Sequence, residues 1–551
     1  MKNRLIALLL AALLVFCMAA CSAQHAADLK SPENQEHSSS SGEQSSESAK
    51  TGTQSDSEHI DFSLTSYYSF FMTSAGYDPA DDPVVQWVQN KFNVTVDSYA
   101  CDWATANDQV RVWVNGGTMP NFMTWPDISV AELKEYADQG LIQPLPENWE
   151  SRWPNLAKMV NITGYSDLVK FDGLTYAIPH ATYGNFNAIS VPALNVGLYL
   201  RKDWAEQVGL DTLGADGCVS MAELKAYLEK VEAAGLCKYP SLGGSTKNLV
   251  SAFLLSNGIN NQDFIDTGTG FIWSPQQEGY AAAIQEFQDW YNAGLITPDF
   301  YTEDQLIGFN KFKEGIMAAA FNSANVGEVQ TTIEALMAAD GLSEIDMKDP
   351  EKRAPYYDKV LFVTLEGDDG TVYSEGTYNY WLMSSFSPET DRLTMERILD
   401  MLDWMSTMEG QASERMGIPG VDFTVDANGV ITVLNEKISS GEYTVSPSRF
   451  FNVWAYCGDD VAFAEGIVGR YKADQDIVKR NVKLKCDGTV FEPSDTVTAL
   501  DSESKKNYSV DIPSAMAEIV VSGTDVDNGI ADFIERNKGL WQPVIDDLSV
   551  K

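Results

Sequence analysis

Aromatic side chains follow the first three predicted strands of this chain. Alternating or continuous apolar residues predict strands over 61–68, 93–99 and 121–125. The aromatic residues at or just beyond the ends of these strands are Tyr67, Tyr68, Trp103 and Trp125. Flat aromatic rings pack against the apolar C–H faces of sugars, and carboxylates, amides and guanidinium groups bind the hydroxyls. The pattern therefore favours a site for a sugar-like ligand.

Each tryptophan also has a packing interpretation, because most tryptophans in a large body belong to a core. Trp290 and Trp404 lie at helical spacing among apolar neighbours and are predicted to be core residues. In the segment 201–204 (RKDW), the tryptophan is predicted to pack, and the arginine and aspartate are predicted to be a helix cap and surface charges. Trp103 lies in a polar stretch, which favours the ligand site. Both interpretations stay open for Trp125 and, later in the chain, Trp381.

A scaffold of alternating strands and helices must position the strand-end residues. Helical patterns over 83–92, 106–115 and 129–139 lie between or after the three strands, giving a β-α-β-α-β-α order within about 80 residues. This order predicts an open doubly wound sheet, in which ligands bind beyond the carboxyl ends of the strands. A second unit with the same alternation begins near Val196.

Composition excludes several classes of function. The 551 residues carry a formal net charge of −41, which disfavours binding to nucleic acids. Only four histidines are present, and His25, His37 and His59 fall in the polar stretch 22–59, so His180 is the one histidine expected in the folded part. Metal sites or catalysis that need several histidines are therefore excluded. Nucleophile-elbow, Walker and dinucleotide-binding motifs are absent from the sequence.

The N-terminus predicts export and a membrane tether. Twelve apolar residues (5–16) follow two basic ones, a length too short to span a bilayer but suitable for a signal peptide. The sequence Met-Ala-Ala-Cys21 resembles the lipobox of bacterial lipoproteins, so residues 1–21 are predicted to be a lipoprotein signal peptide with Cys21 as the lipidated (palmitate-bearing) residue. An incidental cysteine in a plain secretory signal is the alternative. The serine-rich residues 22–59 are predicted to form a disordered linker.

No cofactor or metal is predicted. The segment 212–223 partly matches a calcium loop, but Thr212 and Gly214 stand at its first and third positions, and a helix-capping pair of Ser220 and Glu223 is a sufficient explanation.

Five cysteines follow the linker, and we favour small buried residues over disulfides for them. They are Cys101, Cys218, Cys237, Cys457 and Cys486.

Six motifs in a fixed order carry a resemblance to a known family. They are 113–125 (WVNGGTMPNFMTW), 136–144 (YADQGLIQP), 172–179 (DGLTYAIP), 199–210 (YLRKDWAEQVGL), 312–321 (FKEGIMAAAF) and 409–421 (EGQASERMGIPGV). Together they resemble the extracellular solute-binding proteins of family 1 type, the lipid-anchored receptors of ABC importers for sugars. The motifs cover most of residues 60–430. Two departures are Asn121, where the family usually has aspartate, and Ile316, where lysine is common.

The resemblance implies an α/β, two-lobed periplasmic-binding-protein-like fold of type II with hinge crossovers. The N-terminal lobe is expected from 60–185 plus about 323–405, and the C-terminal lobe from about 190–320 plus 410–551. Ligand contacts are then expected at three crossovers: Tyr183 and Asn187, Phe321 and Asn322, and Tyr378 and Trp381. Trp454 and Tyr456 are more distant candidates.

The implied function is a receptor that closes on a sugar or oligosaccharide and delivers it to an ABC importer without changing it. Such a protein is not an enzyme; it is a lipid-anchored monomer at the extracellular face of a bacterial cell membrane, and its partners are two permease subunits backed by a cytoplasmic ATPase. Two alternatives stay open. A surface glycoside hydrolase needs two carboxylates ~5–10 Å apart, and a receptor for peptides or cationic solutes is favoured by the acidic charge.

Overall fold

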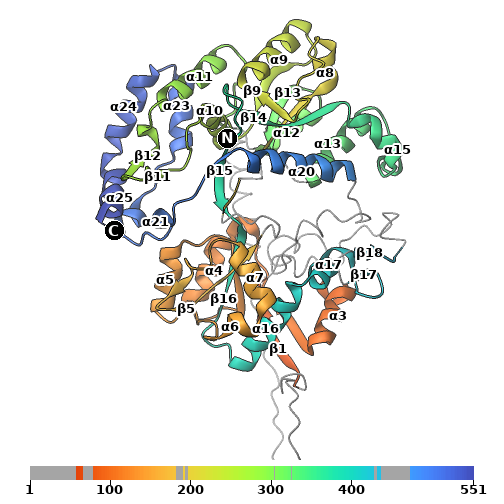
Figure 1. Ribbon diagram of the computed structural model, residues 1–551, viewed down its shortest axis with the longest axis vertical. Helices are drawn as coiled ribbons and strands as arrows, with labels where there is room; N and C mark the ends of the chain where they lie inside the picture. The colour runs from red at the N-terminus through yellow and green to blue at the C-terminus, as the bar shows by residue number, and fades with distance from the viewer. Residues whose placement is uncertain are drawn as a thin grey trace, which may run out of the picture. The chain divides into compact units, whose positions relative to one another are not determined.

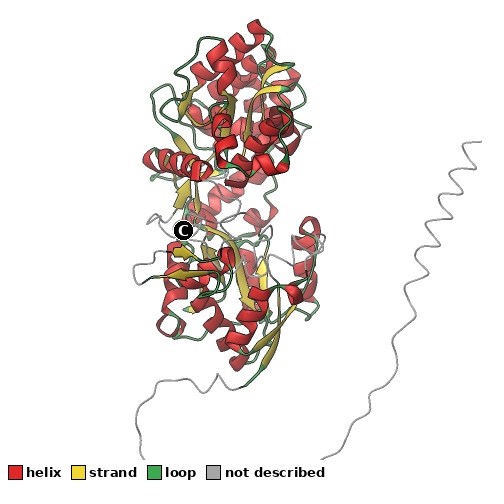
Figure 2. Ribbon diagram, turned by 90° about the vertical axis from the view of Figure 1, so that its right-hand side faces the viewer, coloured by secondary structure: helices red, strands yellow, loops and turns green. Residues whose placement is uncertain are grey.

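The computed structural model describes residues 58–65, 78–181, 190–192, 196–302, 305–323, 326–426, 431–435 and 472–550 (Figure 1). The predicted signal peptide, Cys21 and nearly all of the predicted linker lie outside these residues. Within them, the chain forms two bodies, each built on a five-stranded mixed sheet. In each body, helices pack against the strands (Figure 2). None of the helices in the described ranges combines the length and apolar character needed to cross a membrane.

The first body contains the predicted β-α-β-α-β-α unit. Its sheet has the order β2 (Val94–Ser98), β1 (Ile60–Leu64), β3 (Phe122–Trp125), β16 (Tyr380–Phe386) and β6 (Ile178–Ala181). β1 lies parallel to β2 and β3, whereas β16 runs antiparallel to β3 and β6. The helices that connect the parallel strands are α3 (Pro83–Phe92) and α4 (Ala106–Asn115), and α5 (Val130–Asp138) follows β3. The predicted order is confirmed.

Local chemistry explains where α3 begins and ends. The Asp82 carboxylate accepts hydrogen bonds from the backbone N–H groups of Val84 and Val85, and Pro83 occupies the first helical position, where no N–H is needed. Asn93 ends the helix in the left-handed conformation, with φ 52°. The chain can therefore turn directly into β2.

The first core lies between the sheet and the helices α3, α7 (Pro154–Ile162) and α16 (Arg392–Met405). Trp404, predicted to be a core residue, is only half-buried: its indole lies beside Trp87 at the edge of this core and its Nε1 donates to Glu409. Trp290, by contrast, is buried in the second body, as predicted. Helical spacing places a residue on the packed face, but its depth depends on what covers that face.

The second body has a sheet of the order β10 (Tyr239–Gly243), β13 (Met317–Asn322), β8 (Gly197–Arg201), β14 (Val360–Glu366) and β9 (Cys218–Ser220). Its larger core gathers helices from distant parts of the sequence. They include α9 (Met221–Ala234), α10 (Thr246–Ser256), α11 (Tyr280–Asn292), α23 (Ile512–Ser522), α24 (Val526–Arg536) and α25 (Lys538–Val550).

The division of the chain differs from the expected lobe boundaries. We expected about 323–405 in the first body, but β14 pairs with β8 and β9, and α13 (Val326–Ala339) packs in the second body. We expected 410–551 in the second, but α17 (Met408–Met416) packs against α16 of the first. The physical reason is that β14, buried along most of its length, has a paired neighbour on each edge, and both neighbours, β8 and β9, belong to the second sheet.

A third, three-stranded sheet links the bodies. It has the order β19 (Thr489–Phe491), β15 (Tyr373–Tyr378) and β7 (Ser190–Pro192). β15 leads from the second body directly into β16 of the first, and β7 pairs antiparallel with it. Gly376 lets β19 approach closely, because a Cβ there would lie 2.7 Å from the carbonyl oxygen of Phe491. β15 is therefore a crossover, in the region where one was expected.

Candidate functional site

Of the predicted ligand residues at strand ends in the first body, Trp125 and Trp103 are described. Trp125 ends β3 with only 1% of its surface exposed; its ring stacks on Tyr136 and its Nε1 donates to Ser385 Oγ at 3.0 Å. Trp103 begins a short 3₁₀ helix, Trp103–Thr105, capped by the Asp102 carboxylate, and is 41% exposed. In this arrangement only the Trp103 ring offers a face to solvent.

Phe321 and Asn322, the predicted ligand residues at the end of β13, are both buried. Phe321 is part of the second core, and Asn322 is buried beside it. The next residue, Ser323, accepts a hydrogen bond through its carbonyl oxygen from Tyr199 Oη at 2.5 Å. The structure therefore does not bring this pair together with Trp103 or Trp125 in any described contact.

Tyr378 bridges the two bodies. Its ring packs edge-to-face on Tyr165 of the first body, with centroids 4.8 Å apart, while its hydroxyl donates to Asp495 Oδ1 of the second body at 2.5 Å. Burial raises the pKa of Tyr378, and the Asp495 carboxylate raises it further, so this hydroxyl stays protonated and acts as a donor. Tyr380, two residues on, packs on the same Tyr165 at 4.4 Å.

The side chains of the remaining predicted ligand residues lie outside the described structure. Trp381 lies within β16, but its side chain is outside the described part of the structure, as are six further residues. These are Tyr67, Tyr68, Tyr183, Asn187, Trp454 and Tyr456. For them, the sequence-based expectation stands as a prediction.

A cavity of about 340 Å³ lies beside Tyr378. It is lined by Gln262, Glu375, Gly376, Thr377, Tyr378, Tyr380 and Pro493. Gln262 comes from the second body, Tyr380 from the first, and residues 375–378 from the crossover strand between them. We call this the crossover cavity. Two tyrosines, a carboxylate and an amide are the groups that recognise a polyhydroxylated ligand.

Hydrogen bonds fix the polar groups of the crossover cavity. Gln262 Nε2 donates to the carbonyl oxygen of Phe491 at 2.8 Å, and Glu375 Oε2 accepts from Asn261 Nδ2 at 3.0 Å. Sequence reasoning predicted Tyr378 but missed Gln262, Glu375 and Tyr380. The alternation along β15 and β16 is the one signal that could have found Tyr380, since residues 378 and 380 flank the passage between the strands. Gln262 lies in a loop and carried no signal.

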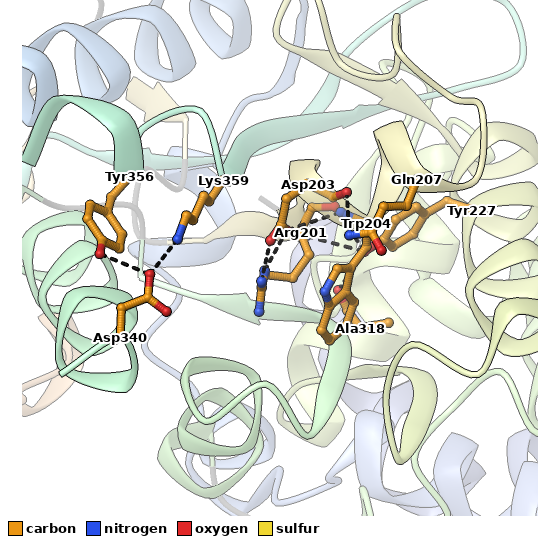
Figure 3. A network of polar contacts seen from close by, with 9 residues as sticks. All are labelled: Arg201, Asp203, Trp204, Gln207, Tyr227, Ala318, Asp340, Tyr356 and Lys359. Atoms are coloured by element: carbon orange, nitrogen blue, oxygen red, sulfur yellow. Dashed lines mark hydrogen bonds and ion pairs between the residues drawn. The ribbon is translucent and has the colours of Figure 1, made fainter.

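The side chains around Arg201 contact one another within the second body (Figure 3). Trp204 is buried, as predicted, and the Arg201 guanidinium lies 4.4 Å from the centre of its ring. The prediction that Asp203 caps the helix is wrong: α8 (Lys202–Gln207) begins directly after Arg201, so Asp203 lies inside the first turn. There its carboxylate pairs with the Arg201 guanidinium, with one bond at 2.7 Å.

The histidines also differ from expectation. His59, expected in the linker, lies at the start of the first body, with its ring nitrogens 3.0 Å from Asn93 Oδ1 and 2.9 Å from Thr95 Oγ1. Two histidines rather than one therefore lie in the part of the chain that the structure describes. His180 is buried in β6 and shares a hydrogen bond of 2.8 Å with Ser384 Oγ.

The segment 212–223 contains β9 and ends in the cap of α9. Ser220 and Glu223 make a complete capping box at the start of α9: the Ser220 hydroxyl accepts from the Glu223 N–H, and the Glu223 carboxylate accepts from the Ser220 N–H at 3.0 Å. Asp216 accepts from the N–H of Cys218. The last carboxylate of a calcium loop is thus engaged as a cap, and the donor set does not fit a cation. Four of the five cysteines after the linker are described: Cys101, Cys218, Cys237 and Cys486. Cys218 is buried, as we favoured, whereas Cys101 and Cys237 are half-buried and Cys486 is exposed, contrary to that expectation.

Comparison with known proteins identifies the class of fold. The chain has the two-lobed α/β fold of ABC-transporter solute-binding proteins, which confirms both the predicted fold class and the predicted resemblance. No family model matches the sequence. The crossovers and the two sheets described above are therefore the framework of a known binding-protein fold.

Particular relatives follow from the same comparisons. The alginate-binding protein AlgQ2, in a calcium-free crystal structure, has a TM-score of 0.58 at 16% identity, with 91% of this chain and 99% of that chain covered. An EF-hand mutant of the S. pneumoniae ABC-transporter substrate-binding protein FusA, in complex with fructo-nystose, has a TM-score of 0.59 at 15% identity, with 90% and 98% covered. An extracellular solute-binding protein from Bifidobacterium longum subsp. infantis has a TM-score of 0.59 at 12% identity, with 89% and 95% covered.

One curated relative is similar in sequence. The fructooligosaccharide ABC transporter substrate-binding protein FusA of Streptococcus pneumoniae serotype 4 is 24% identical over 202 residues, which is 35% of each chain. The match therefore spans about a third of that relative's length.

Proposed function

We propose that this protein is the receptor of an ABC importer and binds a sugar or oligosaccharide between its two bodies. The observation that carries the proposal is the crossover cavity, because Tyr380 of one body, Gln262 of the other and the strand between them line a single space. The fold supports it, since relatives with this fold are named for binding alginate and fructooligosaccharides.

The geometry suits a closing mechanism. Tyr378 connects the bodies through its ring and its hydroxyl, and it stands at the end of the strand that links them. A ligand that bonds to both Gln262 and Tyr380 stabilises the arrangement that brings those residues together. Such differential binding shifts the population toward the closed state, while the crossover strands absorb the rotation.

The finer parts of the proposal concern the ligand contacts and the cellular setting. Trp103 and Tyr378 are the predicted ligand residues whose positions best suit contact: one ring is exposed, and the other lines the cavity. The protein releases its ligand unchanged and is not an enzyme. It is a monomer held at the extracellular face of the cell membrane by lipid on Cys21, and it delivers ligand to permease subunits.

Calorimetry of the purified protein tests the proposal. Titrations with kestose and with alginate and chitin oligosaccharides are expected to give saturable binding by one of them, together with a higher thermal midpoint. Tyr380→Phe and Gln262→Ala are expected to weaken that binding, whereas Lys134→Ala, an exposed control on α5, leaves it unchanged.

Other outcomes would contradict the proposal. Release of reducing sugar during the titration would show a glycoside hydrolase instead. Binding of spermidine or short peptides, with no response to any sugar, would show a receptor for cationic solutes or peptides.

A further inference from the structure

A second cavity, of about 300 Å³, lies within the second body. It is lined by α10, by the loop before β11 (Phe264–Asp266), by the start of α11 and α23, and by the crossover strand. Its polar wall includes Asn261, Asp263, Tyr280 and Glu375, and its apolar wall includes Val250 and Leu254. We call it the inner cavity. It shares Gln262 and Glu375 with the crossover cavity.

Two polar atoms of the inner cavity lack a partner within the described ranges. Tyr280 is fully buried, with no exposed surface, yet its hydroxyl makes no hydrogen bond. Asn261 donates through Nδ2 to Ser251 Oγ and Glu375 Oε2, both at 3.0 Å, while its Oδ1 accepts nothing. A buried polar atom without a partner costs free energy, so such atoms are rare unless a ligand or water completes them.

The charges around this wall favour a ligand that donates hydrogen bonds. Burial raises the pKa of Asp263, although Lys505, Lys247 and a bond from Tyr508 act in the opposite direction. Glu375 stands close enough to raise the pKa of Asp263 slightly. Asp263, Glu375 and Asn261 Oδ1 are acceptors. The Tyr280 hydroxyl supplies a donor, and so does the ammonium group of Lys247, which also lines the cavity.

The donor and acceptor pattern selects the chemical class. No group of three or more carboxylate, thiol or imidazole side chains able to hold a metal occurs among the described residues, which argues against a bound cation. An ammonium group could donate to the carboxylates but could not accept from Tyr280. A hydroxyl does both. The apolar wall at Val250 and Leu254 suits the C–H face of a small ring.

We propose that the inner cavity is a second binding site, for a single small polyhydroxylated molecule such as a free monosaccharide or a cyclic polyol. Tyr280 donates to one hydroxyl of the ligand, and Asn261 Oδ1 and Asp263 accept from others. The site is distinct from the proposed oligosaccharide site because Tyr280 and Asp263 belong wholly to the second body and do not line the crossover cavity.

The test uses the full chain and two matched tyrosine variants. D-glucose, D-galactose, D-fructose and myo-inositol are titrated calorimetrically up to about 50 mM into the wild type, Tyr280→Phe and Tyr380→Phe. We expect one probe to bind the wild type and to bind Tyr280→Phe about tenfold more weakly, because a single hydrogen bond to the ligand is lost. Tyr380→Phe is expected to bind that probe as the wild type does.

A second variant and a crystal structure keep the result interpretable. Asp263→Asn is expected to weaken the same probe, and crystals soaked with that probe are expected to show it beside Tyr280. The proposal is overturned if no probe binds, if Tyr280→Phe binds equally well, or if the soaked cavity contains water only. Oligosaccharide titrations run in parallel separate the two proposals: their failure with monosaccharide binding intact would overturn only the proposed transport function.

Discussion

Buried polar groups of the first sheet and those beside the inner cavity of the second body differ in whether they have hydrogen-bond partners. In the first sheet they bond to one another: Ser384 Oγ lies 2.9 Å from Thr124 Oγ1 and 2.8 Å from His180 Nε2, and Trp125 donates to Ser385. In the second body, Tyr280 Oη and Asn261 Oδ1 find no partner in the described structure. A buried polar group that is hydrogen-bonded within the protein stabilises the fold. A polar group that lines a cavity without a partner is available to bond a ligand.

The ion pairs show a similar contrast. Arg152 and Glu396, in the first body, form two bonds of 2.6 and 2.9 Å and remain partly exposed. Arg353 and Asp474, in the second, are 1% and 0% exposed and 3.3 Å apart. The first pair lowers the pKa of Glu396 to about 2, while burial raises the pKa of Asp474 to about 6. Burial depth, not pairing alone, decides the direction.

The largest expected effect comes from breaking the buried pair. Arg353→Leu leaves Asp474 buried without its arginine and is expected to lower the free energy of unfolding by about 3–5 kcal/mol. Urea denaturation followed by circular dichroism measures the change. Arg152→Leu is the matched control and is expected to cost less, because Glu396 keeps Arg392 and partial access to water. An equal or greater loss in Arg152→Leu would contradict the contrast.

Next in size is the effect of Trp125→Phe. The substitution removes the bond to Ser385 Oγ and leaves a gap beside Tyr136, so unfolding should become easier by about 1–3 kcal/mol. Trp103→Phe, on an exposed ring, serves as the comparison and should change stability by less than about 0.5 kcal/mol. Equal stability losses in the two variants would show that Trp125 is not the packed residue described above.

The partly exposed pair of Arg152 and Glu396 predicts that stability depends on pH. The pKa of Glu396 in the folded protein, about 2, lies below its ordinary value of 4.5. Its contribution is therefore present above about pH 4.5 and is lost as the pH falls toward 2. In Glu396→Gln, the free energy of unfolding should fall less steeply between pH 5 and 3 than in the wild type. Denaturation series at several pH values check this, and parallel curves would refute it.

The smallest expected effect is that of Tyr280→Phe on the ligand-free protein. No hydrogen bond in the described structure is lost, so stability should change by less than about 0.5 kcal/mol. Tyr378→Phe removes the bond to Asp495 and should cost about 1–2 kcal/mol. Thermal denaturation of both variants without sugar measures the two stability changes. A larger loss in Tyr280→Phe would mean that its hydroxyl already has a partner.

Local sequence signals predicted the parts that depend on neighbours in the chain. The β-α-β-α-β-α unit, the capping box of Ser220 and Glu223, and the burial of Trp290 and Trp204 follow from periodicity and nearby residues. The placement of β14 could not be predicted in this way. Its apolar run fits either sheet, and the choice depends on pairing with β8, about 160 residues earlier in the chain.

Local sequence patterns also could not predict most of the residues that line the two cavities. Tyr378 was predicted from its expected crossover, but Gln262, Glu375 and Tyr280 lie far apart in sequence and share no motif. Whether a hydroxyl is satisfied depends on every atom around it, and that information is absent from local patterns.

The amino-acid sequence by itself determined the alternation of strands and helices, because apolar patterns and turn residues act over a few positions. The two-lobed arrangement was expected only from the resemblance to a known family. Only the tertiary structure decided which buried polar groups have hydrogen-bond partners within the protein and which lie beside a cavity without one. Tyr280 and Tyr378 are the same residue type, yet the Tyr378 hydroxyl bonds to Asp495 and the Tyr280 hydroxyl has no partner among the described residues. Packing between distant segments makes that difference.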